Sequence, residues 1–212
     1  MPVRDKLGAV AILAAIALAA PAAAQAGTLS VSPTTINLPA AGGAAVLYVA
    51  NRGTQPTTVQ IESFDWTQTG GTDRLDASQA LQISPPFAQL TPGQRQIIRL
   101  LVGPGGGSQA ERAFRLVVSE LPNPASPVTL GMRVLLQFSV PVFAGPAHAI
   151  APQLVWDARV AAGTVLLTAR NDGNTRAKLT SLRLVTAKGR KRDVAPGSIV
   201  YILSGVSRQW TI

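Results

Sequence analysis

The chain has 212 residues and a formal net charge of +9 at pH 7, from 19 Lys and Arg against 10 Asp and Glu. It has no cysteine and one histidine, which excludes disulfide cross-links and thiol catalysis and argues against a transition-metal site. A basic exported protein can bind anionic lipid, nucleic acid or an acidic protein surface. For an exported protein, nucleic acid is the least expected of these partners.

Residues 1–26 have the layout of a cleavable secretory signal peptide. Arg4 and Lys6 give a positive start, residues 7–20 form an apolar run, and residues 24–26 read Ala-Gln-Ala, a small-residue cleavage site. The apolar run is shorter than the roughly 20 residues that span a bilayer, so an uncleaved anchor is less expected. We therefore predict an exported, soluble mature protein without stable membrane insertion.

The mature part of the chain predicts an all-β fold. Val, Thr, Leu and Ile dominate it, Gly and Pro punctuate it often, and no stretch keeps a helical period. Short strands spaced by about 8–12 residues with turn signals between them are typical of β-sandwiches. We expect strands at residues 29–31, 36–38, 45–50, 59–66, 81–83, 96–102, 113–121 and 129–146, and then at 154–156, 164–170, 178–186, 199–203 and 208–212.

The Gly-Pro-Ala-His segment at residues 145–148 predicts a boundary between two domains. The first domain would span residues 27–146 and the second residues 147–212. Five expected strands in the second domain are fewer than the roughly seven of a complete sandwich. Because the last expected strand also ends at Ile212, we expect a second domain that is truncated at its C-terminus.

The stretch at residues 129–146 differs from the other expected strands. Apolar residues occupy alternate positions and therefore one face of a strand: Met132, Val134, Leu136, Phe138, Val140 and Val142. The stretch is longer than the about five or six residues of a typical strand, and Pro141, which lacks an N–H, suits an edge position. Two interpretations stay open: an ordinary core strand with a rich apolar face, or an edge strand kept for a partner.

Catalytic chemistry finds little support in the sequence. His148 is the only histidine and lies in the expected linker, with no strained nucleophile turn or positioned acid beside it. The acidic residues of the mature chain are not spaced like a metal cage or a calcium-binding loop. We therefore expect no enzyme, no cofactor and no metal site.

Two groups of positive charge are candidates for binding. The basic cluster at residues 188–192 is interpreted as a solvated turn rather than a site for lipid or phosphate. Arg115 alternates with residues that are expected to be buried, so its guanidinium points away from the core and can grip a carboxylate through two hydrogen bonds. The alternative, left open, is a surface arginine paired with Glu111 or Glu120.

Several short fragments, in a fixed order, carry a family resemblance. They are residues 29–34, 84–86, 90–94, 98–99, 111–116, 120–122 and 139–143, followed by 171–174, 182–184, 201–205 and 208–210. Together they span nearly the whole mature chain. In this set the chain resembles the periplasmic chaperones of chaperone–usher pili, especially the archaic branch associated with spore-coat-U-like subunits.

The resemblance implies two immunoglobulin-like domains set at an angle. It also implies a non-enzymatic periplasmic chaperone that binds pilus subunits by donor-strand complementation and delivers them to an outer-membrane usher. The residues that enter the subunit would be Met132, Val134, Leu136, Phe138 and Val140. Whether the free chaperone caps its own strand by forming a dimer stays open.

Members of this family hold the C-terminal carboxylate of the subunit with a basic pair in the cleft between the domains. The matching positions here are Thr35 and Pro141, which carry no charge. Either the anchor is displaced, with Arg115 as first candidate and Arg133 or Arg99 behind it, or main-chain pairing dominates the complex.

Two functions from other classes are alternatives to the chaperone. One is a structural exported β-sandwich protein, such as a pilus or adhesion component, although such a subunit would have a single incomplete domain. The other is an exported accessory that binds carbohydrate or lipid. It lacks an aromatic platform, because Trp66, Trp156 and Trp210 are scattered along the sequence.

Overall fold

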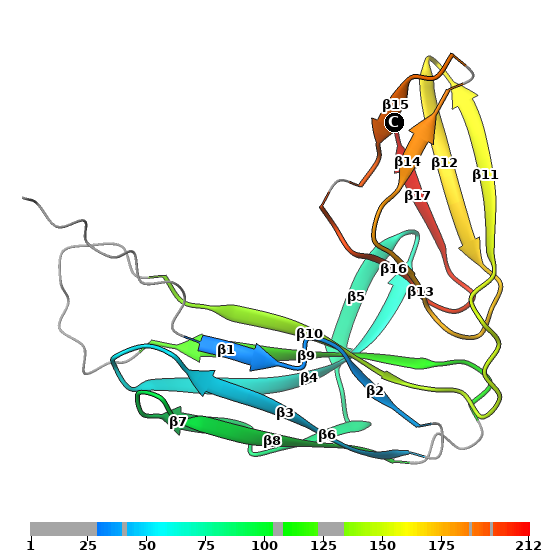
Figure 1. Cartoon of the computed structure of the whole chain (residues 1–212). Helices are drawn as coiled ribbons and strands as arrows, with labels where there is room; N and C mark the ends of the chain where they lie inside the picture. The colour runs from blue at the N-terminus through cyan, green and yellow to red at the C-terminus, as the bar shows by residue number, and fades with distance from the viewer. Residues whose placement is uncertain (1–28, 40–41, 104–107, 123–133, 187, 196) are drawn as a thin grey trace, which may run out of the picture.

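The computed structural model describes residues 29–39, 42–103, 108–122, 134–186, 188–195 and 197–212. In these ranges the chain forms seventeen strands, which confirms the all-β prediction. The strands build two sandwiches set at an angle, so that the molecule is L-shaped (Figure 1). Among the described residues, the structure contains no apolar helix of membrane-spanning length.

Every strand that was expected in the first sandwich is present, and two further strands join them. Its strands are β1 (Leu29–Ser32), β2 (Ile36–Leu38), β3 (Gly43–Asn51), β4 (Thr57–Thr69), β5 (Thr72–Ala77), β6 (Leu81–Ser84), β7 (Phe87–Leu90), β8 (Arg95–Val102), β9 (Arg112–Leu121) and β10 (Gln137–Ala144). The last of these was expected from residue 129, and residues 129–133 lie outside the described ranges.

Two sheets pack face to face in this sandwich. One has the order β1-β3-β8-β6 and the other β2-β10-β9-β4-β5, with β7 also paired to β4. Because side chains of a strand alternate between its faces, every second residue of β3, β8, β9 and β10 points between the sheets. The buried core includes Leu47, Val49, Ile98, Leu100, Leu116, Val118, Val140 and Val142.

The chain changes sheet at Pro33, between the first two strands. β1 runs antiparallel to β3, whereas β2 runs parallel to β10, with Ile36 opposite Val142. Proline has no N–H for a ladder hydrogen bond and therefore interrupts the pairing at this point. One short segment thus supplies an edge strand to each sheet.

The sequence did not predict β5 and β7. All six side chains of β5 are exposed, so the strand has no apolar alternation that a pattern could detect. The β4–β5 hairpin turns at Gly70 and Gly71, whose φ angles of 59° and 81° lie in the left-handed region that favours glycine. β7 begins directly after Pro86, where the two prolines indicated the end of a strand.

The expectation of five strands in the second sandwich is wrong, because seven are present in its described residues. They are β11 (Leu154–Ala161), β12 (Thr164–Asn171), β13 (Ala177–Leu179), β14 (Arg183–Val185), β15 (Lys191–Asp193), β16 (Val200–Ile202) and β17 (Ser207–Thr211). Polar Thr180 and Ser181 divide one expected strand into β13 and β14. The sheets are β11-β12-β17, β13-β16 and β14-β15.

A buried asparagine fixes the turn after β3 in the first sandwich. The Asn51 side-chain amide donates to the carbonyl oxygens of Gln55 at 2.8 Å and Leu90 at 3.0 Å. Its Oδ1 accepts a hydrogen bond from the N–H of Gly53 at 2.8 Å. One side chain therefore satisfies three main-chain groups of a loop that packs on the core.

Asn171 plays the same part at the end of β12 in the second sandwich. Its side-chain amide donates to the carbonyl oxygens of Thr175 at 2.8 Å and Ile202 at 3.1 Å, and its Oδ1 accepts from the N–H of Gly173 at 3.1 Å. The spacing Asn-x-Gly-x-x is the same as in the first sandwich. In both sandwiches an asparagine side chain thus satisfies the main-chain groups of the turn that follows its strand.

Replacing Asn51 with alanine is expected to lower the free energy of unfolding by about 2–4 kcal/mol, because buried main-chain groups lose their partners. Urea denaturation followed by circular dichroism measures this loss. The matched control is Gln55→Ala, since only the main chain of Gln55 takes part in the turn. Equal losses for the two variants would contradict the assigned role of Asn51.

Candidate functional site

β10 is paired along both edges over only part of its length. β9 pairs with it from Gln137 to Ala144, whereas β2 pairs with it only from Val142 to Ala144. Among the described residues, no strand pairs with the second edge between Gln137 and Pro141. Pro141 therefore stands at an edge, as its missing N–H predicts. The open edge offers main-chain groups to another chain.

Burial of the apolar face of this segment rises along the chain. Val134 is 66% exposed, while Leu136 and Phe138 are half-buried against the core of the first sandwich. Val140 is 4% exposed and belongs to that core, so it is not free to enter a partner while the sandwich stays folded. Met132 lies outside the described residues. Of the expected donor residues that the structure describes, Val134 is thus the exposed one, Leu136 and Phe138 are partly accessible, and Val140 is not accessible.

The arginines considered as carboxylate anchors lie far apart in the fold. Arg99 is exposed on β8, in the sheet that does not contain β10. Arg133 lies outside the described residues. Arg115 is on β9 directly opposite Pro141. Of the two candidates that the structure describes, Arg115 is therefore the one next to β10, on the strand that pairs with its closed edge.

The Arg115 guanidinium lies over an aromatic ring near the junction of the two sandwiches. Its Cζ atom is 3.8 Å from the ring centroid of Trp66, a favourable cation–π position. Burial lowers the pKa of Arg115 from its ordinary value, while Asp73 and Tyr201 act in the opposite direction. Arginine nevertheless stays protonated at neutral pH, so the site holds a half-buried positive charge.

The alternative that Arg115 pairs with Glu111 or Glu120 is wrong. Glu111 forms an ion pair with Arg176, and Glu120 accepts a hydrogen bond from Thr57 Oγ1. No ion pair among the described residues includes Arg115. Its guanidinium can therefore donate to a carboxylate of another molecule.

Trp66, Phe143 and Tyr201 form a buried aromatic cluster that joins the two sandwiches. They come from β4, β10 and β16, and their ring centroids lie 5.5–5.8 Å apart. The rings of Trp66 and Tyr201 are nearly perpendicular, at 89°. Such aromatic pairs contribute about 0.5–1.5 kcal/mol each beyond the burial of their area. The C-terminal end of β10 is thus anchored in the junction.

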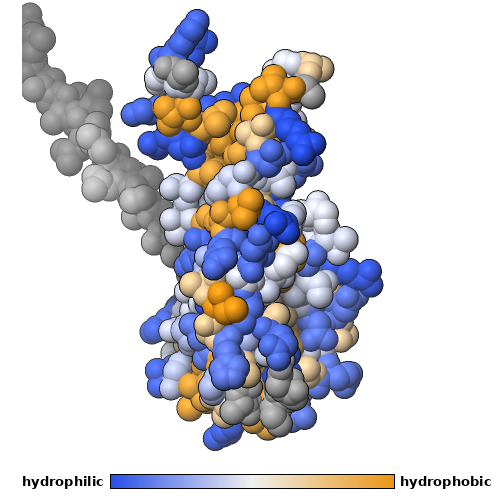
Figure 2. Space-filling model, turned by 90° about the vertical axis from the view of Figure 1, so that its right-hand side faces the viewer, coloured by the Kyte–Doolittle hydropathy of each residue, from blue (hydrophilic) through white to orange (hydrophobic). Residues whose placement is uncertain are grey.

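The expectation that the tryptophans are scattered is wrong for two of them. Trp156 and Trp210 stack with their ring centroids 6.0 Å apart and 22° between the ring planes. They lie on β11 and β17, on either side of β12, where Trp156 is opposite Ala169 and Trp210 is opposite Leu167. Seen from the side, hydrophobic areas on the second sandwich are separated by hydrophilic ones (Figure 2).

Arg176 is a residue of the junction that the sequence did not reveal. Its guanidinium pairs with Glu111 and also donates to Asn37 Oδ1 at 2.7 Å. Its Cζ atom lies 3.6 Å from the ring centroid of Phe143. Arg176 follows a turn, where no alternation of apolar and polar residues marks a side chain as buried. Its partner Glu111 is 65 positions away in the sequence. Only the fold brings the two together.

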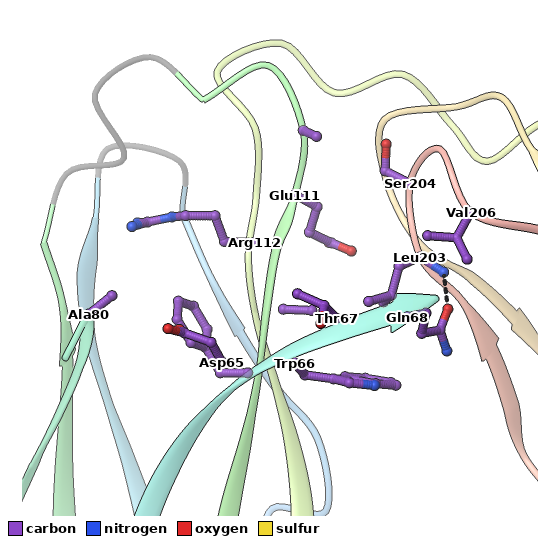
Figure 3. A pocket seen from close by; sticks show the side chains of 13 residues that line it. Asp65, Trp66, Thr67, Gln68, Ala80, Glu111, Arg112, Leu203, Ser204 and Val206 are labelled. Atoms are coloured by element: carbon purple, nitrogen blue, oxygen red, sulfur yellow. Dashed lines mark hydrogen bonds between the residues drawn. The ribbon is translucent and has the colours of Figure 1, made fainter. Parts of the chain in front are cut away.

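The tip of the β4–β5 hairpin reaches the second sandwich. Gln68 Nε2 donates to the carbonyl oxygen of Tyr201 at 3.0 Å. The N–H of Leu203 donates to Gln68 Oε1 at 3.0 Å (Figure 3). Beside this contact lies a cavity of about 550 Å³, whose wall includes Thr67 and Glu111. The cavity belongs to the junction and separates the hairpin from the start of β9.

The remaining sequence candidates lie away from this site. His148 is exposed between β10 and β11, and its carbonyl oxygen accepts a hydrogen bond from Asn174 Nδ2 at 2.7 Å. The basic cluster at residues 188–192 is exposed around a turn at Gly189, as predicted. In the part of the chain that the structure describes, no group of three or more His, Cys, Asp or Glu side chains is arranged to hold a metal ion.

One family model matches the chain over residues 28–149, which is more than half of its length. It is described as pili and flagellar-assembly chaperone, PapD N-terminal domain. No curated protein sequence matches the chain.

Solved structures of chaperones share the fold. The CsuC–CsuE chaperone–tip adhesion subunit complex of archaic Csu pili from Acinetobacter baumannii matches with 24% identity and a TM-score of 0.70, covering 88% of each chain. The E. coli chaperone DraB matches with 20% identity and a TM-score of 0.63, over 87% of this chain and 84% of that one. Pseudomonas aeruginosa CupB2 matches with 17% identity and a TM-score of 0.59, over 85% and 87%. The fold is therefore that of two tandem immunoglobulin-like domains.

Replacing Arg176 with methionine is expected to destabilise the protein by about 3–5 kcal/mol. The Glu111 side chain, which is 7% exposed, would then carry a buried charge without its ion-pair partner. Urea denaturation measures the loss. The double variant Glu111→Gln/Arg176→Met is expected to recover part of it, since no buried charge is then left without a partner. A double variant that is no more stable than Arg176→Met would contradict this explanation.

Proposed function

The chain belongs to the pili and flagellar-assembly chaperone family, and on that basis we propose that it binds pilus subunits by lending them the β10 segment as a missing strand. Its general role is that of its family, a chaperone for pilus subunits. The mechanism rests on one observation above all, the edge of β10 that no described strand pairs between Gln137 and Pro141. A subunit strand added there would satisfy these main-chain groups.

The side chains that enter the subunit are, in this proposal, Met132, Val134, Leu136 and Phe138. The exposure of Val134 and the half-burial of Leu136 and Phe138 support this choice. Val140 is not included, because its side chain is buried in the core of the first sandwich. Each such side chain contributes roughly 1.5–3 kcal/mol when it passes fully from water into a core. Leu136 and Phe138 gain less than this, which keeps the complex open to exchange with another subunit's strand.

Arg115 is the residue that we propose for holding the C-terminal carboxylate of the subunit. Ile36 is opposite Val142, so Thr35 precedes it in the same row as Pro141, and Arg115 continues that row on β9. Pro141 and Arg115 are thus cross-strand neighbours, and Thr35 comes just before the first residue of β2 that pairs with β10. A displacement of the charge by one strand, from β10 to β9, keeps it next to Pro141 and one strand away from the open edge.

The biological setting is part of the same proposal. CsuC forms a pre-assembly complex with the tip adhesion subunit CsuE, which supports a pilus subunit as partner here and an outer-membrane usher as recipient. We place the mature chain in the periplasm after removal of residues 1–26, with domains at 27–146 and 147–212. The chain would act there without enzymatic activity and without nucleic acid.

Replacing Val134 with aspartate is expected to abolish co-purification with a co-expressed pilus subunit while the isolated protein stays folded, since a charge cannot enter the subunit core. Affinity capture followed by gel analysis measures this. The matched control is Leu135→Asp, because Leu135 is also exposed but points to the opposite face of the segment. Retained capture by Val134→Asp, or equal losses in both variants, would reject the donor assignment.

Replacing Arg115 with alanine is expected to raise the Kd for the subunit by about tenfold or more, since a charge-assisted hydrogen bond contributes about 1.5–3 kcal/mol. Titration of the purified subunit against the chaperone measures the change. Arg99→Ala removes the same charge from the exposed face of the other sheet and is expected to change Kd little. An anchor at Arg115 is ruled out if the two variants behave alike.

A further inference from the structure

The ladder between β9 and β10 ends at Glu120 in an irregular way. Ser119 and Gln137 form its last regular pair, and the N–H of Glu120 then donates to the carbonyl oxygen of Leu136 at 2.8 Å. A regular antiparallel pair would return a bond from the N–H of Leu136 to the main-chain oxygen of Glu120. The N–H of Leu136 donates instead to the side-chain atom Oε2 of Glu120, at 3.2 Å. A carboxylate thus takes the place of a main-chain acceptor.

The same carboxylate is held in position from its other side. Its second oxygen, Oε1, accepts a hydrogen bond from Thr57 Oγ1 at 3.0 Å. Thr57 is the first residue of β4 and is buried. Hydrogen bonds to an ionised carboxylate are stronger than those between neutral groups. Glu120 therefore links a fixed point on β4 to the main chain at the start of β10.

The contact between the Glu120 carboxylate and Leu136 lies where the donor segment separates from the first sandwich. Residues 134–136 belong to no strand, and Val134 is exposed while Leu136 is half-buried. A strand that slips by one residue turns every side chain to the opposite face. A contact that holds the main chain of Leu136 would prevent such a slip and would fix which side chains leave the sandwich.

We propose that Glu120 is a positioning residue of the donor strand, and that its carboxylate, set by Thr57, fixes the point at which the segment leaves β9. The inference rests on the proposed function, because it assigns Glu120 a role in presenting Val134 and Leu136 to the subunit. It adds a residue outside the donor segment and outside the carboxylate anchor. The bond to Leu136 itself is a property of the free protein.

Amide hydrogen exchange of the isolated full chain, followed by NMR, tests the bond. Glu120→Ala is expected to speed exchange of the Leu136 amide by about tenfold or more, while core amides of β8 keep their protection. Glu120→Gln is expected to retain most of the protection, since its amide oxygen can accept from Leu136 and its NH₂ can donate to Thr57. The control is Glu62→Ala, an exposed carboxylate on β4. An unchanged Leu136 amide in Glu120→Ala, or an equal change in Glu62→Ala, overturns the inference.

Capture of a co-expressed pilus subunit tests the consequence for binding. Glu120→Ala is expected to reduce capture several-fold, and Glu120→Gln is expected to restore most of it. If Glu120→Ala speeds exchange but captures the subunit as well as the unaltered chain, while Val134→Asp does not capture it, Glu120 has no positioning role and the donor function stands. If Val134→Asp captures the subunit too, the proposed function fails and this inference fails with it.

Discussion

The structure depends on how the main-chain hydrogen-bonding groups of β10 are satisfied. β9 pairs with the whole strand, but β2 reaches only Val142 to Ala144 because it is three residues long and starts after the break at Pro33. The C-terminal end of β10 is consequently a central strand and its N-terminal end an edge. Exposed edges recruit other chains. One strand therefore belongs to the core and also presents an open edge.

The junction between the sandwiches keeps this strand in a fixed setting. Phe143 packs in the aromatic cluster, two residues after Pro141, which is opposite Arg115 in the sheet. Arg176 closes the cluster from the second sandwich and is neutralised by Glu111. The charges that hold the architecture together are thus paired, whereas the Arg115 guanidinium lies over Trp66 with no carboxylate bound among the described residues. The arginine proposed for binding is thus distinct from the one that joins the sandwiches.

Much of the fold could be predicted from apolar alternation. Leu116 and Val118, or Ile98 and Leu100, carry a period of two because one face of each strand is buried. β5 and β15 were not predicted, because all their side chains are exposed and the sequence therefore shows no alternation of apolar and polar residues there. The apolar alternation of residues 132–142 was evident from the sequence, but the burial of Val140 was not, since the pattern does not say where along the strand the sandwich core begins. Arg176 and Glu120 act through partners distant in sequence, and the chain order gives no sign of such pairs.

The contact made by Gln68 couples two units that have separate cores. Its side chain belongs to the first sandwich and donates there to Asp73 Oδ1, yet its two other hydrogen bonds end on the main chain at Tyr201 and Leu203. If the end of β16 opened locally, a buried amide on the other sandwich would lose two of its three partners, which is costly. Partial unfolding of one sandwich is thereby discouraged by the other. The two sandwiches are therefore expected to open together at the elbow of the molecule rather than one at a time.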